Sequence, residues 1–210
     1  MNWDAERQLL ARDLGQILAE KGVVQFGNFT LSSGKTSPYY IDLRLVPSFP
    51  EVFVKVVTTY EHSLKTLIGL DNVGAVGGVP TSGLTYAAVV AHNLKKPLVY
   101  VREKNKAYGK GKKIEGVLKP GCKVALIDDL ITTGGSLVKT IDALRQIGGE
   151  VDNAVVLIDR LEGGRDLLAD KGVKLDAIIT VGELADLLYE MDKIDIKQHE
   201  YIKSQIESNS

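Results

Sequence analysis

The residues Lys123-Val-Ala-Leu-Ile-Asp-Asp-Leu-Ile-Thr-Thr-Gly-Gly-Ser136 carry most of the information about the architecture of this chain. The first five of them, 123–127, are mostly apolar and predict a buried strand. Two adjacent acids, Asp128 and Asp129, follow, and a loop of small hydroxyl and glycine residues then leads into a helix predicted over 137–147. A strand, a loop and a helix in this order are typical of a βαβ unit, from which parallel sheets are built.

The same alternation continues on both sides of this stretch. The pattern predicts strands over 73–76, 97–101, 123–127, 151–158 and 175–181, and helices over 84–93, 137–147, 166–171 and 184–189. The predicted strands are β-branched and apolar, as expected when helices cover both faces of a sheet. We therefore expect an α/β fold with a central, mainly parallel sheet flanked by helices.

A smaller N-terminal part precedes this sheet. A helix is predicted over 5–21, short strands over 23–31 and 37–43, and a helix over 50–67 that starts at Pro50. At 210 residues we expect a single domain over 1–210. Its N-terminal helix and hood extend to about residue 45, its core covers 46–190, and a polar tail over 191–210 has room for a short helix.

The composition excludes several classes of protein. The net charge of -1 gives no sign of a uniformly basic surface for nucleic acids or membranes. Cys122 is the only cysteine, which excludes an intrachain disulfide and any multi-cysteine metal site. No apolar run approaches the ~20 residues of a membrane span, and the polar N-terminus does not resemble a signal peptide. We expect a cytoplasmic protein without nucleic-acid or membrane partners.

The acids and the loop at 128–136 suit two different chemical groups. Ligands of open α/β sheets bind beyond the carboxyl ends of the strands. The amide groups of residues 132–136, at the start of a helix, suit a phosphate. Asp128 and Asp129 would repel that anion and instead suit sugar hydroxyls or the coordination shell of a metal. Together they describe a sugar phosphate, whereas a plain strand, turn and helix would not need two acids.

This stretch resembles the phosphoribosyl-pyrophosphate (PRPP) binding motif of the type I phosphoribosyltransferases. Residues 26–43 resemble the N-terminal signature of the orotate phosphoribosyltransferase family, 102–109 its mobile catalytic loop, and 158–164 its base-site strand. These segments occur in the family's order, and the likeness covers about residues 5–190. It implies transfer of the phosphoribosyl group from PRPP to orotate in pyrimidine (UMP) biosynthesis, with Mg²⁺ bound mainly through PRPP and no separate metal site.

The resemblance also assigns roles to residues. The catalytic residues are expected to be Arg102, Lys106, Asp128 and Asp129. The residues expected to bind PRPP are Thr81, Ser82, Arg102, Lys106, Tyr108, Asp128, Asp129, Leu130, Ile131, Thr132, Thr133, Gly134, Gly135 and Ser136. The residues expected to bind orotate are Lys35, Tyr40, Thr132 and Arg160.

Two of these regions can also be interpreted from their residue types alone. Residues 102–116 hold six cations and two acids, a local charge of +4, and three glycines, which predicts a mobile loop that closes over a polyanion or, more simply, a solvated charge run. By resemblance this loop reaches the neighbouring subunit's site, which implies a homodimer. Arg160 can bind a planar carboxylate with its fork of donors, or it can form a surface ion pair with Glu162.

The sequence departs from the family at a few positions. Many members have lysine where this chain has Ser32, Ser82 and Glu103, and histidine where it has Tyr108. Two other functions therefore stay open: a PRPP-dependent transferase for another base, and a catalytically inactive PRPP-sensing regulator. Arg160 and residues 26–43 favour an acidic pyrimidine. A nucleotide triphosphatase is rejected, because the Gly-Lys-Thr at 34–36 lacks the P-loop's first glycine and no helix pattern follows it.

Overall fold

The computed structural model describes residues 3–30, 36–102 and 113–209. Its main sheet has six strands in the order β5-β4-β3-β6-β7-β8. The strands are β3 (Ala75–Gly78), β4 (Leu98–Val101), β5 (Ile114–Glu115), β6 (Lys123–Ile131), β7 (Glu150–Asp159) and β8 (Lys174–Thr180). Only β5 pairs antiparallel, and the other neighbours are parallel. The predicted α/β architecture is confirmed.

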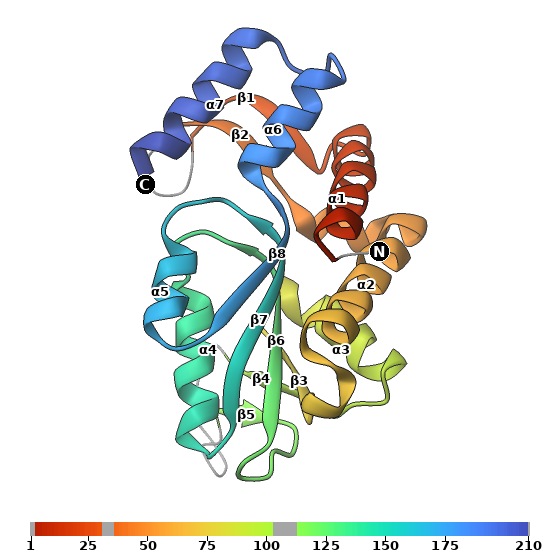
Figure 1. Ribbon diagram of the computed structural model, residues 1–210, viewed down its shortest axis with the longest axis vertical. Helices are drawn as coiled ribbons and strands as arrows, with labels where there is room; N and C mark the ends of the chain where they lie inside the picture. Colours follow the sequence, from red (N-terminus) through yellow and green to blue (C-terminus); the bar gives the residue numbers. More distant parts are fainter. Residues whose placement is uncertain (1–2, 31–35, 103–112, 210) are drawn as a thin grey trace.

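Helices cover both faces of this sheet (Figure 1). Helices α2 (Pro50–Ser63) and α3 (Ser82–Asn93) lie on one face, and α4 (Gly135–Gln146) and α5 (Gly164–Asp170) lie on the other. Alternate residues of β6 serve the two cores: Ala125 and Ile127 pack with α2 and α3, whereas Val124 and Leu126 pack with α4. Burial on both faces explains why the strands are apolar along their whole length.

The two ends of the chain form the hood together. Strands β1 (Val24–Thr30) and β2 (Thr36–Ile41) make an antiparallel two-stranded sheet, beside which lie α1 (Trp3–Glu20), α6 (Val181–Glu190) and α7 (Ile196–Asn209) (Figure 1). Arg7 on α1 makes a two-pronged ion pair with Glu183 on α6, with N–O distances of 2.7 and 3.1 Å. Helix α7 is 14 residues long because one face, carrying the fully buried Ile202, packs on α6.

The structure differs from the sequence-based boundaries most clearly in three places. The strand expected to end at residue 127 continues to Ile131, because its backbone pairs with β7 as far as Asp159. The helix expected over 50–67 ends at Ser63 and continues as a π-helical turn, Leu64–Ile68. The interpretation of 102–116 entirely as a loop is wrong at Ile114–Glu115, which forms β5 by pairing with β4.

Short 3-10 helices, Leu43–Ser48 and Leu70–Asn72, complete the elements. No helix in the described part of the chain is long and apolar enough to cross a membrane.

Candidate active site

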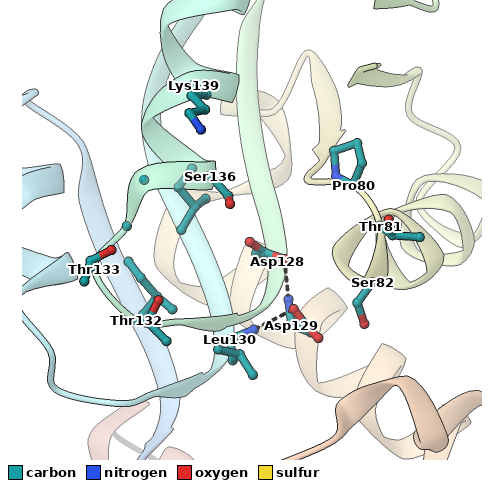
Figure 2. A pocket seen from close by; sticks show the side chains of 14 residues that line it. Pro80, Thr81, Ser82, Asp128, Asp129, Leu130, Thr132, Thr133, Ser136 and Lys139 are labelled. Carbon is teal, nitrogen blue, oxygen red and sulfur yellow. Dashed lines mark hydrogen bonds between the residues drawn. The ribbon is translucent and has the colours of Figure 1, made fainter. Parts of the chain in front are cut away.

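A cavity of about 340 Å³ opens at the carboxyl end of β6 (Figure 2). Every residue from 128 to 137 lines it, together with Pro80, Thr81, Ser82 and Lys139. One wall is therefore the end of β6 with the loop into α4, and the facing wall is the loop between β3 and α3. This is the place where parallel sheets usually bind their ligands.

The loop from β6 to α4 depends on glycine. Gly134 has φ of 83°, in the left-handed region that glycine adopts at little cost, and this conformation lets α4 begin at the next residue. The first amide groups of a helix have no helical carbonyl to bind. Those of α4 lie at the cavity wall, where backbone donors and the positive end of the helix dipole favour an anion.

Asp128 is the inner and more deeply buried of the two acids. It is buried, and its Oδ1 accepts a hydrogen bond of 2.9 Å from the backbone N–H of Asp129. Its own carbonyl accepts a hydrogen bond of 2.7 Å from the Tyr60 hydroxyl. Gly83 brings α3 close, because a Cβ there would lie only 2.6 Å from Asp128 Oδ1. Burial, followed by the charge of Asp129, raises the pKa of Asp128 well above its ordinary value.

Asp129 is the outer acid and is partly exposed at the cavity. Its Oδ1 accepts a hydrogen bond of 2.9 Å from the backbone N–H of Leu130 (Figure 2). Since both carboxylates use one oxygen for a neighbouring amide, both side chains are held in place. The resulting wall is fixed, acidic and rich in acceptors for hydroxyl groups.

Arg160 lies in the turn that follows β7, beside this cavity. Its backbone N–H donates to the carbonyl of Ile131, at 3.0 Å, so the turn is attached to the end of β6. Its side chain is 14% exposed, with Nε 2.9 Å from Glu162 Oε1. The guanidinium lies 5.0 Å from the centre of the Tyr39 ring. The ion pair with Glu162 is therefore present but is mostly buried, not at the surface.

Two other predicted residues have partners outside the main cavity. Arg102 Nη1 lies 3.0 Å from Glu115 Oε1, and Arg102 lines a neighbouring cavity of about 270 Å³ together with Lys113 and Lys139. The Tyr40 hydroxyl accepts a hydrogen bond of 3.0 Å from Arg44. Lys35, Lys106 and Tyr108 lie outside the described residues.

The sequence matches the phosphoribosyl transferase domain family over residues 59–185. Among curated proteins, orotate phosphoribosyltransferase of Cenarchaeum symbiosum is 40% identical over 172 residues, which is 82% of this chain and 86% of the relative. The enzyme of the same name from Sulfolobus acidocaldarius is 34% identical over 197 residues, or 94% of this chain and 98% of the relative. The chain belongs to the orotate phosphoribosyltransferase family.

Solved structures of the family agree with this fold. A crystal structure of orotate phosphoribosyltransferase from Aeropyrum pernix has a TM-score of 0.70 at 36% identity, covering 85% of this chain and 99% of that one. UMP synthase of Leishmania donovani has a TM-score of 0.82 at 33% identity, covering 94% of this chain but 42% of that protein. The fold of this family member is therefore that of type I phosphoribosyltransferases.

The structure gathers most of the residues assigned by resemblance to the orotate phosphoribosyltransferase family. Thr81, Ser82 and the whole stretch 128–136 line one cavity. Lys139 also lines it and was missed by the sequence analysis, although it lies one helical turn beyond Ser136 (Figure 2). Tyr39 was missed as well, because the contact between β2 and the turn after β7 leaves no local pattern.

Proposed function

We propose that this chain transfers the 5-phosphoribosyl group from PRPP to orotate, forming orotidine 5′-monophosphate and pyrophosphate. The observation that carries this proposal is the single cavity in which an acidic strand end adjoins an anion-binding loop. The acids suit ribose hydroxyls and the loop suits a phosphate, so the cavity matches both parts of a phosphoribosyl group. The relatives named orotate phosphoribosyltransferase support orotate as the base.

The PRPP is bound along the wall from β6 to α4. The amide groups of residues 132–136 and the hydroxyls of Thr132, Thr133 and Ser136 donate hydrogen bonds to the 5′-phosphate. Asp128 and Asp129 accept hydrogen bonds from the ribose 2′ and 3′ hydroxyls. Thr81 and Ser82, on the facing wall, bind the pyrophosphate group.

Orotate is bound at the end of the cavity next to β7. The guanidinium of Arg160 presents a planar fork of donors, which matches the planar carboxylate that distinguishes orotate from uracil. Thr132, at the start of the phosphate loop, adjoins this end, since its carbonyl accepts a hydrogen bond of 3.1 Å from the backbone N–H of Gly164, where α5 begins after that turn. Lys35 and Tyr40 complete the base site in this proposal.

Magnesium suits the donors of this cavity. Mg²⁺ prefers oxygen ligands and takes one or two carboxylates together with substrate phosphates. Asp128 and Asp129 are adjacent, and burial with mutual repulsion already disfavours two negative charges there. A bound cation would relieve that repulsion. When bound, mainly through PRPP, it would neutralise charge on the departing pyrophosphate.

In the reaction, the bond between the anomeric carbon and the pyrophosphate oxygen breaks, and the leaving oxygen keeps the electron pair. A ring nitrogen of orotate forms the new bond to the same carbon and releases its proton, which the departing pyrophosphate accepts. Positive charge develops on the ribose, and the nearby carboxylates of Asp128 and Asp129 stabilise it. Arg102, Lys106 and Tyr108 contact the pyrophosphate and complete the site.

The loop that carries these three residues closes over a neighbouring subunit's site in this proposal, so the enzyme acts as a homodimer and excludes water from the reacting cation.

Serine at 32 and 82 and glutamate at 103 reduce the positive charge around the substrates relative to many members. Pyrimidine biosynthesis in the cytoplasm is the proposed setting.

The test is an absorbance assay of the purified protein with PRPP, magnesium and one base at a time: orotate, uracil, hypoxanthine or adenine. We expect turnover of orotate alone. An Asp129→Asn variant prepared in the same way controls for a contaminating host enzyme and should lose about 10²–10³ in kcat. Preference for another base would overturn the proposed substrate, and no turnover with any base would favour a regulator that binds PRPP.

A further inference from the structure

The guanidinium of Arg160 is held from two directions by side chains that the sequence analysis did not assign. The Tyr39 ring covers it at 5.0 Å, a distance typical of a cation–π contact. Glu162 Oε1 lies 2.9 Å from Nε, the inner edge of the guanidinium. Tyr39 is 5% exposed, and the side chain of Glu162 is 25% exposed. Tyr39 therefore contacts the face of the guanidinium and Glu162 contacts its Nε edge. Arg160 is held in this way before any ligand is bound.

The turn that carries Glu162 and Arg160 has contacts of its own, which are centred on Asp159. Asp159 is fully buried, and its Oδ1 accepts a hydrogen bond of 2.9 Å from the backbone N–H of Leu161. The other oxygen, Oδ2, lies 3.2 Å from Arg165 Nη2. Leu161 has φ of 59°, a left-handed conformation that is rare for a side chain of this kind and reverses the chain. This local geometry is maintained because the buried carboxylate binds the turn from inside.

The contacts leave donors of Arg160 for a ligand. A guanidinium carries five N–H groups, and its outer edge, formed by Nη1 and Nη2, matches a carboxylate in two parallel hydrogen bonds. Glu162 lies off the direction of the Nε–H bond, so its contact with Nε is ionic and not a linear hydrogen bond. A side chain fixed before binding loses less conformational entropy when the ligand arrives.

We propose that Glu162 and Tyr39 are positioning residues that hold Arg160 ready for the carboxylate of the base, and that they thereby set the preference for an acidic pyrimidine over a neutral one. This inference rests on the proposed function of the same cavity. Glu162 has a second effect in this proposal. Its negative charge offsets the positive charge of Arg160 when no base is bound.

The experiment compares wild-type enzyme with Glu162→Gln, measuring KM for orotate, KM for PRPP and the ratio of kcat/KM for orotate to that for uracil. Hydrogen bonds and ionic contacts of charged groups exceed neutral ones by roughly 1 kcal/mol, so we expect KM for orotate to rise about fivefold. The orotate-to-uracil ratio should fall by a similar factor, and KM for PRPP should stay within about twofold. Glu162→Asp keeps the charge and should restore part of the orotate affinity.

Tyr39 is tested by a pair of variants. Tyr39→Phe keeps the aromatic face and loses only the hydroxyl, which shares a hydrogen bond with Arg160, so it should raise KM for orotate less than Tyr39→Leu does. Melting temperatures of all variants identify a general loss of structure. Glu190→Gln is the matched control, because Glu190 pairs with Arg12 at 3.4 Å on the exposed side of α6, away from the cavity.

The outcomes separate the inference from the proposed function. If the wild-type enzyme does not turn over orotate, the proposed function fails and the inference fails with it. If it does, and Glu162→Gln leaves KM for orotate and the orotate-to-uracil ratio unchanged, only the positioning role is overturned. A lower KM for orotate in Glu162→Gln would also overturn it, because Glu162 would then be a competitor for Arg160. Equal increases in both KM values would indicate a structural role alone.

Discussion

The two ends of the cavity are built in different ways. The proposed phosphate end is one continuous stretch, residues 128–136, in which backbone amides and a left-handed glycine form the cavity wall. The proposed base end lies beside this cavity lining, at β2 and the turn after β7, and it depends on the side chains of Tyr39, Arg160 and Glu162. A backbone site is sensitive to added atoms, whereas a side-chain site is sensitive to the loss of particular groups. Substitutions should therefore affect the two ends differently.

The largest effect is expected from the lysine proposed to act on the pyrophosphate. Lys106→Ala should lower kcat with orotate and PRPP by about 10²–10³, the usual loss when one preorganised donor to a developing negative charge is removed. KM for orotate should change little, because this lysine is assigned to the PRPP side. Steady-state kinetics with Lys119→Ala, an exposed lysine beyond the loop, provide the control. An unchanged kcat would refute the catalytic role of the loop.

A conservative change at the base end should affect only the base. Arg160→Lys keeps the positive charge but loses the planar fork, so KM for orotate should rise by about 10- to 100-fold. KM for PRPP, measured at saturating orotate, should stay close to the wild-type value. If KM for orotate and KM for PRPP rose together, the base end and the phosphate end would not act independently.

A single added carbon beside Thr132 should weaken binding at the phosphate end. A Cβ on Gly164 would lie 2.4 Å from the Thr132 carbonyl oxygen, too close for any real contact. We expect Gly164→Ala to displace this loop, raise KM for PRPP about tenfold and cost about 1–3 kcal/mol of folding free energy. Gly182→Ala is the control, because its nearest neighbour would be at an ordinary 3.6 Å. A Gly164→Ala enzyme with normal KM for PRPP would show that the loop adapts easily.

The smallest effect is expected away from both ends, at the ion pair between α1 and α6. Burial acts to raise the pKa of Glu183, but hydrogen bonds from Arg7 and Thr180 outweigh it, so the pKa is lowered overall. A lowered carboxyl pKa stabilises the fold above the unfolded value of about 4.3, and this stability is lost as the pH falls through the folded value. With Glu183 39% exposed, Glu183→Gln should cost only about 1 kcal/mol at pH 7.

Urea unfolding at pH 7 and at about pH 3 measures this difference. The gap between wild type and Glu183→Gln should shrink at the lower pH, because the glutamate is protonated in the unfolded state there and increasingly protonated in the folded state as the pH falls. Both KM values should match those of the wild type at neutral pH. A gap of equal size at both pH values would mean that the charge of Glu183 contributes nothing to stability.

The phosphate end could be predicted from sequence because its residues are contiguous. An apolar strand, two acids and a small-residue loop contain the whole local pattern, and the sheet arrangement follows from repeated units of this kind. The sequence pattern predicted that this strand ends at residue 127, which is too early. Polar acids follow residue 127, so the pattern gives no sign that β6 pairs with β7 as far as Ile131. Lys139 was missed because its place at the cavity depends on the phase of α4.

The base end could be predicted only in part. Arg160 was found by resemblance, but the aromatic ring that covers it belongs to Tyr39, whereas Tyr40 was the residue expected to bind the base. Successive residues of a strand point to opposite faces, so a choice between neighbours needs the sheet to be placed in space. The Tyr40 hydroxyl accepts a hydrogen bond from Arg44, four residues along, and its role at the base stays a prediction. A contact between distant segments has no local signature.

The most direct test of the two-ended cavity is a calorimetric titration of PRPP with magnesium into wild-type, Arg160→Lys and Gly164→Ala proteins in the absence of any base. We predict that Arg160→Lys binds PRPP with wild-type affinity, while Gly164→Ala binds it about tenfold more weakly. Equal weakening by both substitutions would contradict the account, because the base end would then be part of the phosphate site.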